Sequence, residues 1–310
     1  MKWMKKILSL IITLFVVSLV TFFAFRVIPG DSAIAKLGLE ASEEQIEALR
    51  EQMGLNDNLL VQYGRFLSGA VQGDFGESTQ YNVPVSSLIA DRFPVTAWLA
   101  ALSFLLIVVI SLPLGILASK KENGIIDRGI TLLTQTLMAI PSFFLGIIIM
   151  LVFGVILKWF APGDYVKPSE NFGQFLSYMI FPALAVSIPK IAMMVKFLKT
   201  SVLRELRLDY VRTAKSKGQT KNVILYRHVL KNALMPVITF LGMITAESLA
   251  GSIVVEQVFN LPGMGRLLVT AIFNRDYPVV QAAVLYIAAI VVLINFGVDV
   301  LYRKVDPRIA

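Results

Sequence analysis

Six long apolar segments constrain this chain more than any other feature of its sequence. A helix that crosses the hydrocarbon core of a bilayer needs about 20 mostly apolar residues. Six segments meet that requirement: residues 7–27, 94–118, 130–157, 175–195, 234–255 and 278–301. Only 16% of the 310 residues are charged, whereas soluble domains carry about 25%. The sequence therefore predicts an all-α membrane protein with six transmembrane helices.

Lysine and arginine residues are distributed unevenly between the two sides of these spans. Cytoplasmic loops of membrane proteins carry an excess of both residue types. Nineteen of the 29 lie on the side of the amino terminus, and nine lie on the opposite side. Since six spans place both termini on one side, we expect both termini in the cytoplasm. The net charge of +8 then follows from topology, which argues against nucleic acid as a partner.

The stretches between the apolar segments divide the chain into three predicted regions. Residues 1–28 form an amino-terminal tail and the first span, and residues 29–93 form a small helical external region. Residues 94–310 form a five-span core with cytoplasmic helices at about 198–232. A cysteine placed at Ser78, in the external region, is expected to react with a thiol reagent added outside the cell.

Two amphipathic helices are predicted in the external region. Ser42 and Gln45 have the spacing of a capping box, in which each side chain accepts a hydrogen bond from the other residue's backbone N–H. Gly54 is expected to end this first helix. A second apolar-periodic stretch follows and is expected to end at Gly73.

Several kinds of chemistry are disfavoured by residues that the chain lacks. It contains no cysteine, and its single histidine, His228, argues against a histidine metal site or a Ser-His-Asp triad. The phosphate-binding motif G-x-x-x-x-G-K-[ST] does not occur, and the glycines of "LPGMGRLL" are expected in a turn. We therefore expect no metal site, no catalytic residues and no cofactor in this chain.

The predicted cytoplasmic loop between the fourth and fifth spans carries ten basic and two acidic residues. Asp209 is predicted to cap the amino end of a short helix, because its side chain accepts hydrogen bonds and its charge suits that end. Gly218 is expected to end this helix in the left-handed conformation. Thr220 is expected to cap a second helix that runs to Pro236 and the fifth span.

Ala214 and Gly218 lie four positions apart in this loop, and their small size would let another surface approach closely. Two interpretations of the loop are open. It could be a positively charged segment that touches anionic lipid, or it could be a docking element for a cytoplasmic partner.

Sequence blocks along nearly the whole chain resemble one family of proteins. "DYVRTAKSKG", followed by "RHVLKNALMPVIT", resembles the coupling motif of ABC importer permeases, and more specifically of the peptide/nickel permease family. Further matching blocks are "RVIPGD", "GLNDNLLVQY", "GDFGES", "RFPVTAWLA", "AIPSFFLG", "VVEQVFNLPGMGRLL", "RDYPVVQ" and "DPRI". Arg212 and Thr213 stand where the broader importer motif has an acidic residue, a pattern that is common in the peptide subfamily.

The resemblance implies one permease subunit of an ATP-driven importer, which forms half of a translocation pathway in the bacterial inner membrane. The implied partners are a second, homologous permease, two cytoplasmic ATPase subunits that bind ATP and magnesium, and an external solute-binding protein. The chain itself is then not an enzyme. The short cytoplasmic helix is implied to dock on an ATPase subunit through Asp209, Tyr210, Arg212, Thr213, Ala214, Lys215, Lys217 and Gly218.

Peptides are the substrates that the resemblance favours, while a nickel chelate or another small solute stays an open alternative. A self-contained secondary transporter and an intramembrane enzyme are alternatives of other classes. The first usually carries an internal repeat and the second needs a catalytic constellation, and the sequence shows neither.

Ionisable residues inside membrane spans are costly and often functional. Glu247, in the fifth span, could face the translocation path and meet a peptide amino terminus, or it could pair with a neighbouring helix. Lys190, in the fourth span, could line the path or extend its side chain to the membrane interface. Glu256 and Asp299 lie close to span ends and are expected at the interface. Asp276, in the block "RDYP", is expected to pair locally or to cap a turn.

Overall fold

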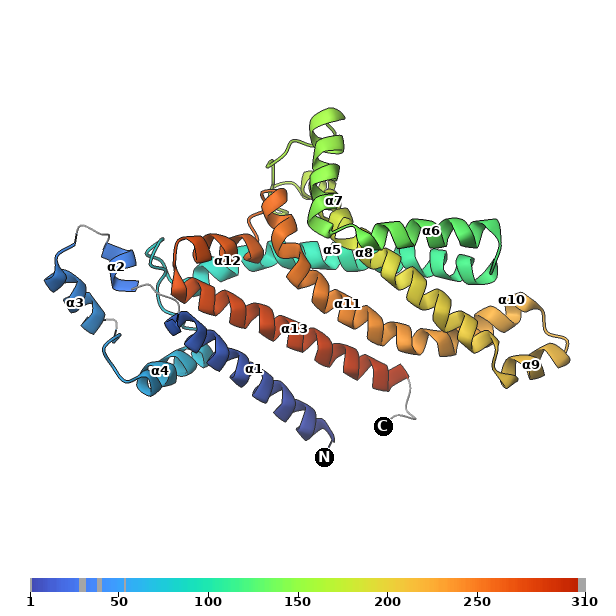
Figure 1. Ribbon diagram of the computed structural model, residues 1–310, viewed down its shortest axis with the longest axis horizontal. Helices are drawn as coiled ribbons and strands as arrows, with labels where there is room; N and C mark the ends of the chain where they lie inside the picture. The colour runs from blue at the N-terminus through green and yellow to red at the C-terminus, as the bar shows by residue number, and fades with distance from the viewer. Residues whose placement is uncertain (1, 28–31, 38–40, 53, 306–310) are drawn as a thin grey trace. The chain divides into compact units, whose positions relative to one another are not determined.

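The computed structural model describes residues 2–27, 32–37, 41–52 and 54–305, and its regular structure is helical (Figure 1). The first half contains α1 (Lys2–Val27), α2 (Ser32–Leu37), α3 (Glu43–Gln52), α4 (Leu59–Gln72), α5 (Val85–Lys120), α6 (Ile125–Ala139), α7 (Ser142–Ile149) and the π-helical segment η1 (Met150–Ile156). The second half contains α8 (Phe172–Leu206), α9 (Asp209–Ser216), α10 (Lys221–Val223), the π-helical segment η2 (Ile224–Val229), α11 (Leu230–Val258), α12 (Met264–Phe273) and α13 (Tyr277–Val305). The predicted all-α class is confirmed.

Five helical segments among the described residues are long and apolar enough to cross a membrane. They are Lys6–Ala24, Val85–Lys120, Phe172–Leu206, Lys221–Leu249 and Tyr277–Val298. A sixth candidate is the bent pair formed by α6 with α7 and η1, which occupies the position of the third predicted span. The cytoplasmic location of the termini stays a prediction from the charge distribution.

The third predicted span, residues 130–157, is not one continuous helix. α6 ends at Ala139, α7 begins at Ser142, and the two parts are bent by 99°. Ile140 and Pro141 both have extended backbone, with ψ angles of 122° and 143°. A proline has no backbone N–H to donate, and its ring disfavours a helical conformation at the residue before it. Pro141 therefore accounts for the break, which makes the pair a broken span or a re-entrant loop.

Pro236 does not separate the second cytoplasmic helix from the fifth span. It lies inside α11, and α10, η2 and α11 follow one another without a gap from Lys221 to Val258. Pro182 and Pro189 likewise lie inside α8. Prolines are tolerated within membrane helices because neighbouring groups can satisfy the backbone carbonyls that they leave free.

The chain folds into two compact units. The first joins Met1–Thr96 with Pro262–Val292, and the second joins Ala97–Leu261 with Leu293–Ala310. Residues of α5 and of α13 therefore belong to both units. The three-region division expected from the sequence stays a prediction.

In the first unit, α4 packs along α1 through aromatic side chains. The ring centroids of Tyr63 in α4 and Phe22 in α1 are 5.4 Å apart, and the Tyr63 hydroxyl lies 2.8 Å from Ser18 Oγ. Phe66 adds a second aromatic contact, 5.7 Å from Phe22. Part of the predicted external region thus lies against a candidate membrane span.

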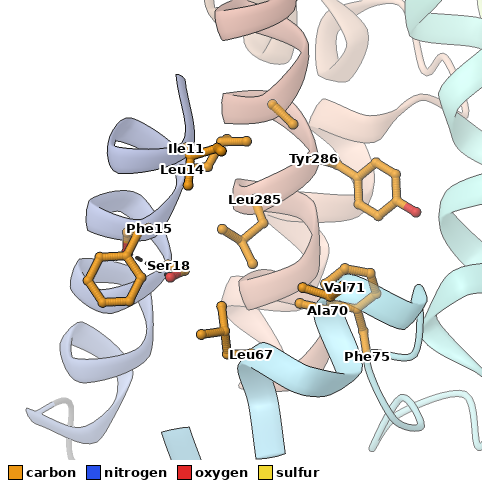
Figure 2. A pocket seen from close by; sticks show the side chains of 11 residues that line it. Ile11, Leu14, Phe15, Ser18, Leu67, Ala70, Val71, Phe75, Leu285 and Tyr286 are labelled. Carbon is orange, nitrogen blue, oxygen red and sulfur yellow. Dashed lines mark hydrogen bonds between the residues drawn. The ribbon is translucent and has the colours of Figure 1, made fainter. Parts of the chain in front are cut away.

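A pocket of about 490 Å³ lies beside this contact, between α1, α13 and α4 with the residues that follow it (Figure 2). The hydroxyls of Ser18 and Tyr286 are its only side-chain polar groups. It is lined by Ile11, Leu14, Phe15, Ser18, Leu67, Ala70, Val71, Phe75, Leu285, Tyr286 and Ala289. An apolar surface of this kind suits helices that lie in hydrocarbon.

Both helices of the predicted external region have the predicted caps. Ser42 N donates to Gln45 Oε1 at 3.1 Å, and Gln45 N donates to Ser42 Oγ at 3.3 Å. Gly54 and Gly73, which follow α3 and α4, have φ angles of +65° and +77°. The capping box and both glycine stops are therefore confirmed.

α8 supplies the central part of the core of the second unit. Met194, Leu198 and Val202 of this helix are almost completely buried, and they pack in one cluster with residues of α9, η2 and α11. Gly115 of α5 meets the same face, where an added Cβ would lie 2.8 Å from a Leu198 methyl carbon. Ser201 Oγ donates to the carbonyl of Ala233 in α11 at 2.9 Å. These contacts set the positions of the segments that connect α8 to α11.

Candidate functional site

The predicted coupling segment lies beyond the carboxyl end of α8 (Figure 1). It consists of α9, a turn at Gly218 and the start of α10. The expected order of helix, glycine turn and helix is therefore confirmed.

Asp209 is not the N-cap of α9, contrary to the prediction. Leu208 occupies the capping position with extended backbone, and no side chain caps the helix there. The carbonyl of Leu208 accepts a hydrogen bond from Val211 N at 3.1 Å. Asp209 instead lies in the first turn, where its charge still favours the positive end of the helix dipole. Its carboxylate lies 3.6 Å from Arg212 Nη1, and both side chains are exposed.

Gly218 and Thr220 have the roles that the sequence predicts. Gly218 has a φ angle of +76°, and its N–H donates to the carbonyl of Lys215 at 3.0 Å. The Thr220 side chain accepts a hydrogen bond from Val223 N at 3.5 Å at the start of α10. An added Cβ at Gly218 would meet nothing within 4 Å. The requirement for glycine at this position therefore comes from the backbone conformation of this chain.

α9 presents one buried face and one exposed face. Val211 and Ala214 are buried, and they belong to the same cluster as Ile224 and Leu225 of η2. Ala214 is only 8% exposed, so its small side chain fits the core of its own chain. The expectation that Ala214 admits an outside surface therefore has no support in the structure. The exposed residues of α9 and its turn are Asp209, Arg212, Thr213, Lys215, Ser216, Lys217 and Gly218.

Tyr210 connects α9 to the end of α8. It is half-buried, and its hydroxyl donates to Glu205 Oε2 at 2.8 Å. Burial is the main cause that raises the pKa of Tyr210, and the Glu205 carboxylate raises it further, while a hydrogen bond with Asn232 opposes the change. Tyr210 therefore stays a neutral hydrogen-bond donor and holds α9 against the rest of its unit.

The buried Asp127 and the half-buried Lys199 form an ion pair that was not anticipated from the sequence. The Lys199 ammonium donates to Asp127 and, at 3.3 Å, to Thr131 Oγ1. The other carboxylate oxygen of Asp127 accepts a hydrogen bond from Asn123 N at 3.0 Å. The pair joins the start of α6 to α8. The two residues are 72 positions apart, and no local pattern in the sequence relates them.

Lys190 and Glu247 also form an ion pair, between α8 and α11. The Lys190 side chain is 13% exposed, whereas the Glu247 side chain is 61% exposed. The pairing alternative for Glu247 is thus present in the structure, and Lys190 contacts a carboxylate within the span. Glu247 nevertheless keeps an open face on the surface of the chain.

The other ionisable residues singled out in the sequence have varied surroundings. Glu256 lies near the end of α11, but its side chain is completely buried within the protein. It is therefore not exposed to a membrane interface, contrary to the expectation. The side chain of Asp299 lies outside the described part of the structure.

Asp276 is completely buried at the start of α13, where it accepts hydrogen bonds from Ser78 Oγ, Thr79 N and Gln80 N. Asp276 therefore holds a turn, as expected, but the turn is formed by residues 196 to 198 positions away and the pairing is not local.

Ser78 is a poor reporter of the outer side, contrary to the expectation. Its side chain is completely buried and donates to Asp276. A sequence offers no direct sign of such burial, because the two residues are 198 positions apart.

Two family models match nearly the whole chain between them. Residues 111–310 match the binding-protein-dependent transport system inner membrane component, and residues 2–100 match the amino-terminal part of such membrane components. The chain belongs to this family. Its members are membrane permease subunits of ABC importers, in which partner subunits hydrolyse ATP. This permease is accordingly a multi-pass protein of the inner membrane.

Curated relatives of this permease align over almost their full length. The oligopeptide transport system permease protein AppB of Bacillus subtilis is 38% identical over 296 residues, which are 94% of each chain. The glutathione transport system permease protein GsiC of Escherichia coli K12 is 39% identical over 305 residues, covering 98% of this chain and 97% of GsiC. The probable peptide ABC transporter permease protein y4tP of Sinorhizobium fredii is 34% identical over 306 residues, covering 99% and 98%.

A solved structure of the MetNI methionine ABC transporter in an inward-facing conformation has a similar fold. The TM-score is 0.57 at 19% identity, and the match covers 70% of this permease and 96% of the MetNI chain. This likeness supports the fold of the permease.

Proposed function

We propose that this permease is one subunit of a peptide importer. In this proposal it pairs with a second, homologous permease, and the two form a translocation pathway. Two cytoplasmic ATPase subunits drive the cycle, and an external solute-binding protein delivers the peptide. The observation that supports peptides as the substrate class is the full-length similarity to relatives named for oligopeptide, peptide and glutathione transport.

The exposed face of α9 is the proposed contact with an ATPase subunit. Arg212, Thr213 and Lys215 lie on this face and are free to meet another protein. Val211 and Ala214 hold the opposite face in the core, and Tyr210 bonds to Glu205. A helix fixed in this way moves together with α8 and α11. It can therefore pass a displacement from the cytoplasmic subunit to the spans, which is what coupling requires.

The open side of Glu247 is the proposed contact with substrate in the path. Its carboxylate is mostly exposed although it is paired with Lys190 inside the span. Membrane-embedded ionisable residues usually face a bundle interior or an aqueous cavity. A carboxylate in such a place can attract the ammonium group of a peptide amino terminus, while Lys190 compensates its charge when the path is empty.

Uptake by the reconstituted complex tests the substrate class. The permease is purified with its partner subunits, placed in liposomes with ATP inside or outside, and supplied with the solute-binding protein and labelled peptides. We expect uptake that needs both ATP on the cytoplasmic face and the binding protein. A partner ATPase with its catalytic glutamate replaced serves as the control without hydrolysis.

Three outcomes would contradict the proposal in different ways. Uptake of a nickel chelate or another solute, with no peptide uptake, would replace the substrate class. Uptake by the permease alone, without ATPase subunits, would indicate a self-contained transporter. If the complex hydrolyses ATP normally although its ATPase subunits do not contact α9, the importer assignment stands and only the proposed coupling role of α9 is removed.

A further inference from the structure

A basic groove lies beside the coupling segment in the second unit. Its volume is about 660 Å³, and it is formed where α5, α8 and α10 come together. The residues that line it are Ser119, Lys120, Lys121, Glu122, Leu203, Leu206, Arg207, Lys215, Thr220, Lys221, Asn222, Ile224 and Leu225.

The rim of this groove carries a strong positive charge. Five of the lining residues are basic, all of them exposed, and only one is acidic. That acid, Glu122, lies 3.7 Å from Arg207. Among the described residues, no carboxylate pairs with any of the other four basic side chains: Lys120, Lys121, Lys215 and Lys221. The groove therefore has an excess of cations that an anionic ligand would compensate.

The groove also has apolar walls, which lie near the ends of helices that are candidate membrane spans. α5 and α8 are candidate spans that end at Lys120 and Leu206, and a third candidate span begins at Lys221. Leu203 and Leu206 are half-buried on the wall of the groove, which the buried Ile224 and Leu225 also line. Basic side chains next to apolar ones at a span end match the headgroup and the first acyl carbons of a phospholipid. Inorganic phosphate, a nucleotide or an acidic protein segment would need only the basic side chains.

We propose that this groove binds an anionic phospholipid, with its phosphate held by Lys120, Lys121 and Lys221. Basic pockets between membrane helices on the cytoplasmic side recognise lipid headgroups by this chemistry. The hydroxyl of Thr220, which accepts a hydrogen bond from Val223 N, lies in the same groove and can supply a neutral donor. Of the proposed coupling residues, only Lys215 lines the groove, so the lipid site and the exposed face of α9 are largely separate.

Lipid retention by the purified complex tests this proposal. The groove variant carries Lys120→Gln, Lys121→Gln and Lys221→Gln. The control variant carries Lys196→Gln, Arg227→Gln and Lys231→Gln, which remove equal charge at exposed positions outside the groove. Each complex is placed in nanodiscs that contain phosphatidylglycerol and phosphatidylcholine, and the retained lipids are counted by native mass spectrometry. We expect the groove variant to lose at least about tenfold in phosphatidylglycerol affinity, and the control to lose little.

Two further arms identify the source of the phosphate group. Inorganic phosphate and ATP are titrated against the bound phosphatidylglycerol in the wild-type complex. We expect neither to displace the lipid at concentrations equal to that of the headgroup. Equal displacement would overturn the lipid assignment in favour of a soluble phosphate ligand. Equal loss of lipid in the groove and control variants would overturn the site itself. Loss of ATPase subunits from the groove variant with unchanged lipid binding would show a protein interface instead.

Discussion

Lys190 of α8 and Glu247 of α11 are ion-paired, and both lie within candidate membrane spans. Lys190 is largely buried and Glu247 is largely exposed on its own chain. An ion pair inside a membrane is expensive to maintain. The unequal exposure means that the lysine is held within its unit, while the carboxylate keeps room for a second cation.

Glu247→Gln is expected to lower the uptake of peptides with a free amino terminus. The substitution keeps the shape of the side chain and removes the charge that attracts an ammonium group. Since exposed ion pairs are worth about 0–1 kcal/mol, the effect on apparent affinity is at most about fivefold. The measurement compares free and amino-terminally acetylated peptides in reconstituted complexes, and acetylated peptides should be unaffected.

Asp127→Asn is the matched control, because Asp127 pairs with Lys199 in the same unit but is buried. It should lower thermal stability without changing the preference between free and acetylated peptides. If Glu247→Gln leaves that preference unchanged, Glu247 has no role in the path.

Gly218→Val is expected to weaken coupling while leaving membrane insertion intact. At a φ angle of +76°, a β-carbon costs about 1–2 kcal/mol, and a β-branched residue fits this conformation badly. Gly129 of α6 is the matched control: its Cβ would also meet nothing within 4 Å, and its φ angle is not positive. Substrate-stimulated ATP hydrolysis and uptake are measured beside expression level. Equal behaviour of Gly218→Val and Gly129→Val would remove the coupling role of this turn.

Ala214→Asp and Thr213→Asp are expected to fail in different ways although they are neighbours. Ala214 is buried among Val211 and Leu225, so a carboxylate there lacks a partner and destabilises the fold by about 3 kcal/mol or more. Thr213 is exposed, and a change there should stay within about 0.5 kcal/mol in stability. Thermal unfolding separates the two variants, and a pull-down of ATPase subunits tests whether Thr213→Asp weakens docking.

The local features of the fold followed from the sequence because their causes are local. The capping box at Ser42, the stops at Gly54 and Gly73 and the left-handed turn at Gly218 each depend on residues within a few positions. The break at Pro141 has an equally local cause. It was missed because the span was assigned from the length of its apolar segment, without regard to the proline inside it. At Pro236 the same residue type does not break the helix, so proline alone does not decide where a span ends.

The pairings of the candidate site could not be derived from the sequence in the same way. Glu247 is 57 positions from Lys190, and Asp276 is 198 positions from Ser78. Hydropathy places each residue in or near a span, but it does not say which helix face is covered. Ala214 shows the consequence, because a small residue fits a tight core as well as it fits a docking surface.

Cysteine labelling tests the orientation of the permease in the membrane. The chain has no cysteine, so each introduced thiol is unique. Glu44→Cys in α3 should react with an impermeant reagent from outside, and Ser216→Cys in α9 should not, since both positions are exposed. Ser78→Cys should react poorly from either side because it is buried. The reverse pattern for residues 44 and 216 would overturn the cytoplasmic location of α9.

Asp276→Ala is expected to release the segment between α4 and α5. The buried carboxylate accepts hydrogen bonds from Ser78 Oγ, Thr79 N and Gln80 N. Without the carboxylate these donors lose their acceptor, and each buried donor left unpaired lowers the stability of the fold by about 1–3 kcal/mol. Limited proteolysis should then cut near residues 78–82 many times faster than in the wild type.

Asp91→Asn is the control for general effects of charge, because Asp91 is exposed on α5. It should leave the cleavage rate unchanged. Ser78→Ala removes one donor to the carboxylate and the acceptor of Tyr81 N, but Thr79 N and Gln80 N stay paired with Asp276, so its effect should be smaller than that of Asp276→Ala. Since the contact lies on the side predicted to be external, uptake should fall when the segment is released, while ATPase subunits stay bound. Unchanged proteolysis in Asp276→Ala would show that the isolated pairing of Glu77 with Pro84 is sufficient to hold this segment.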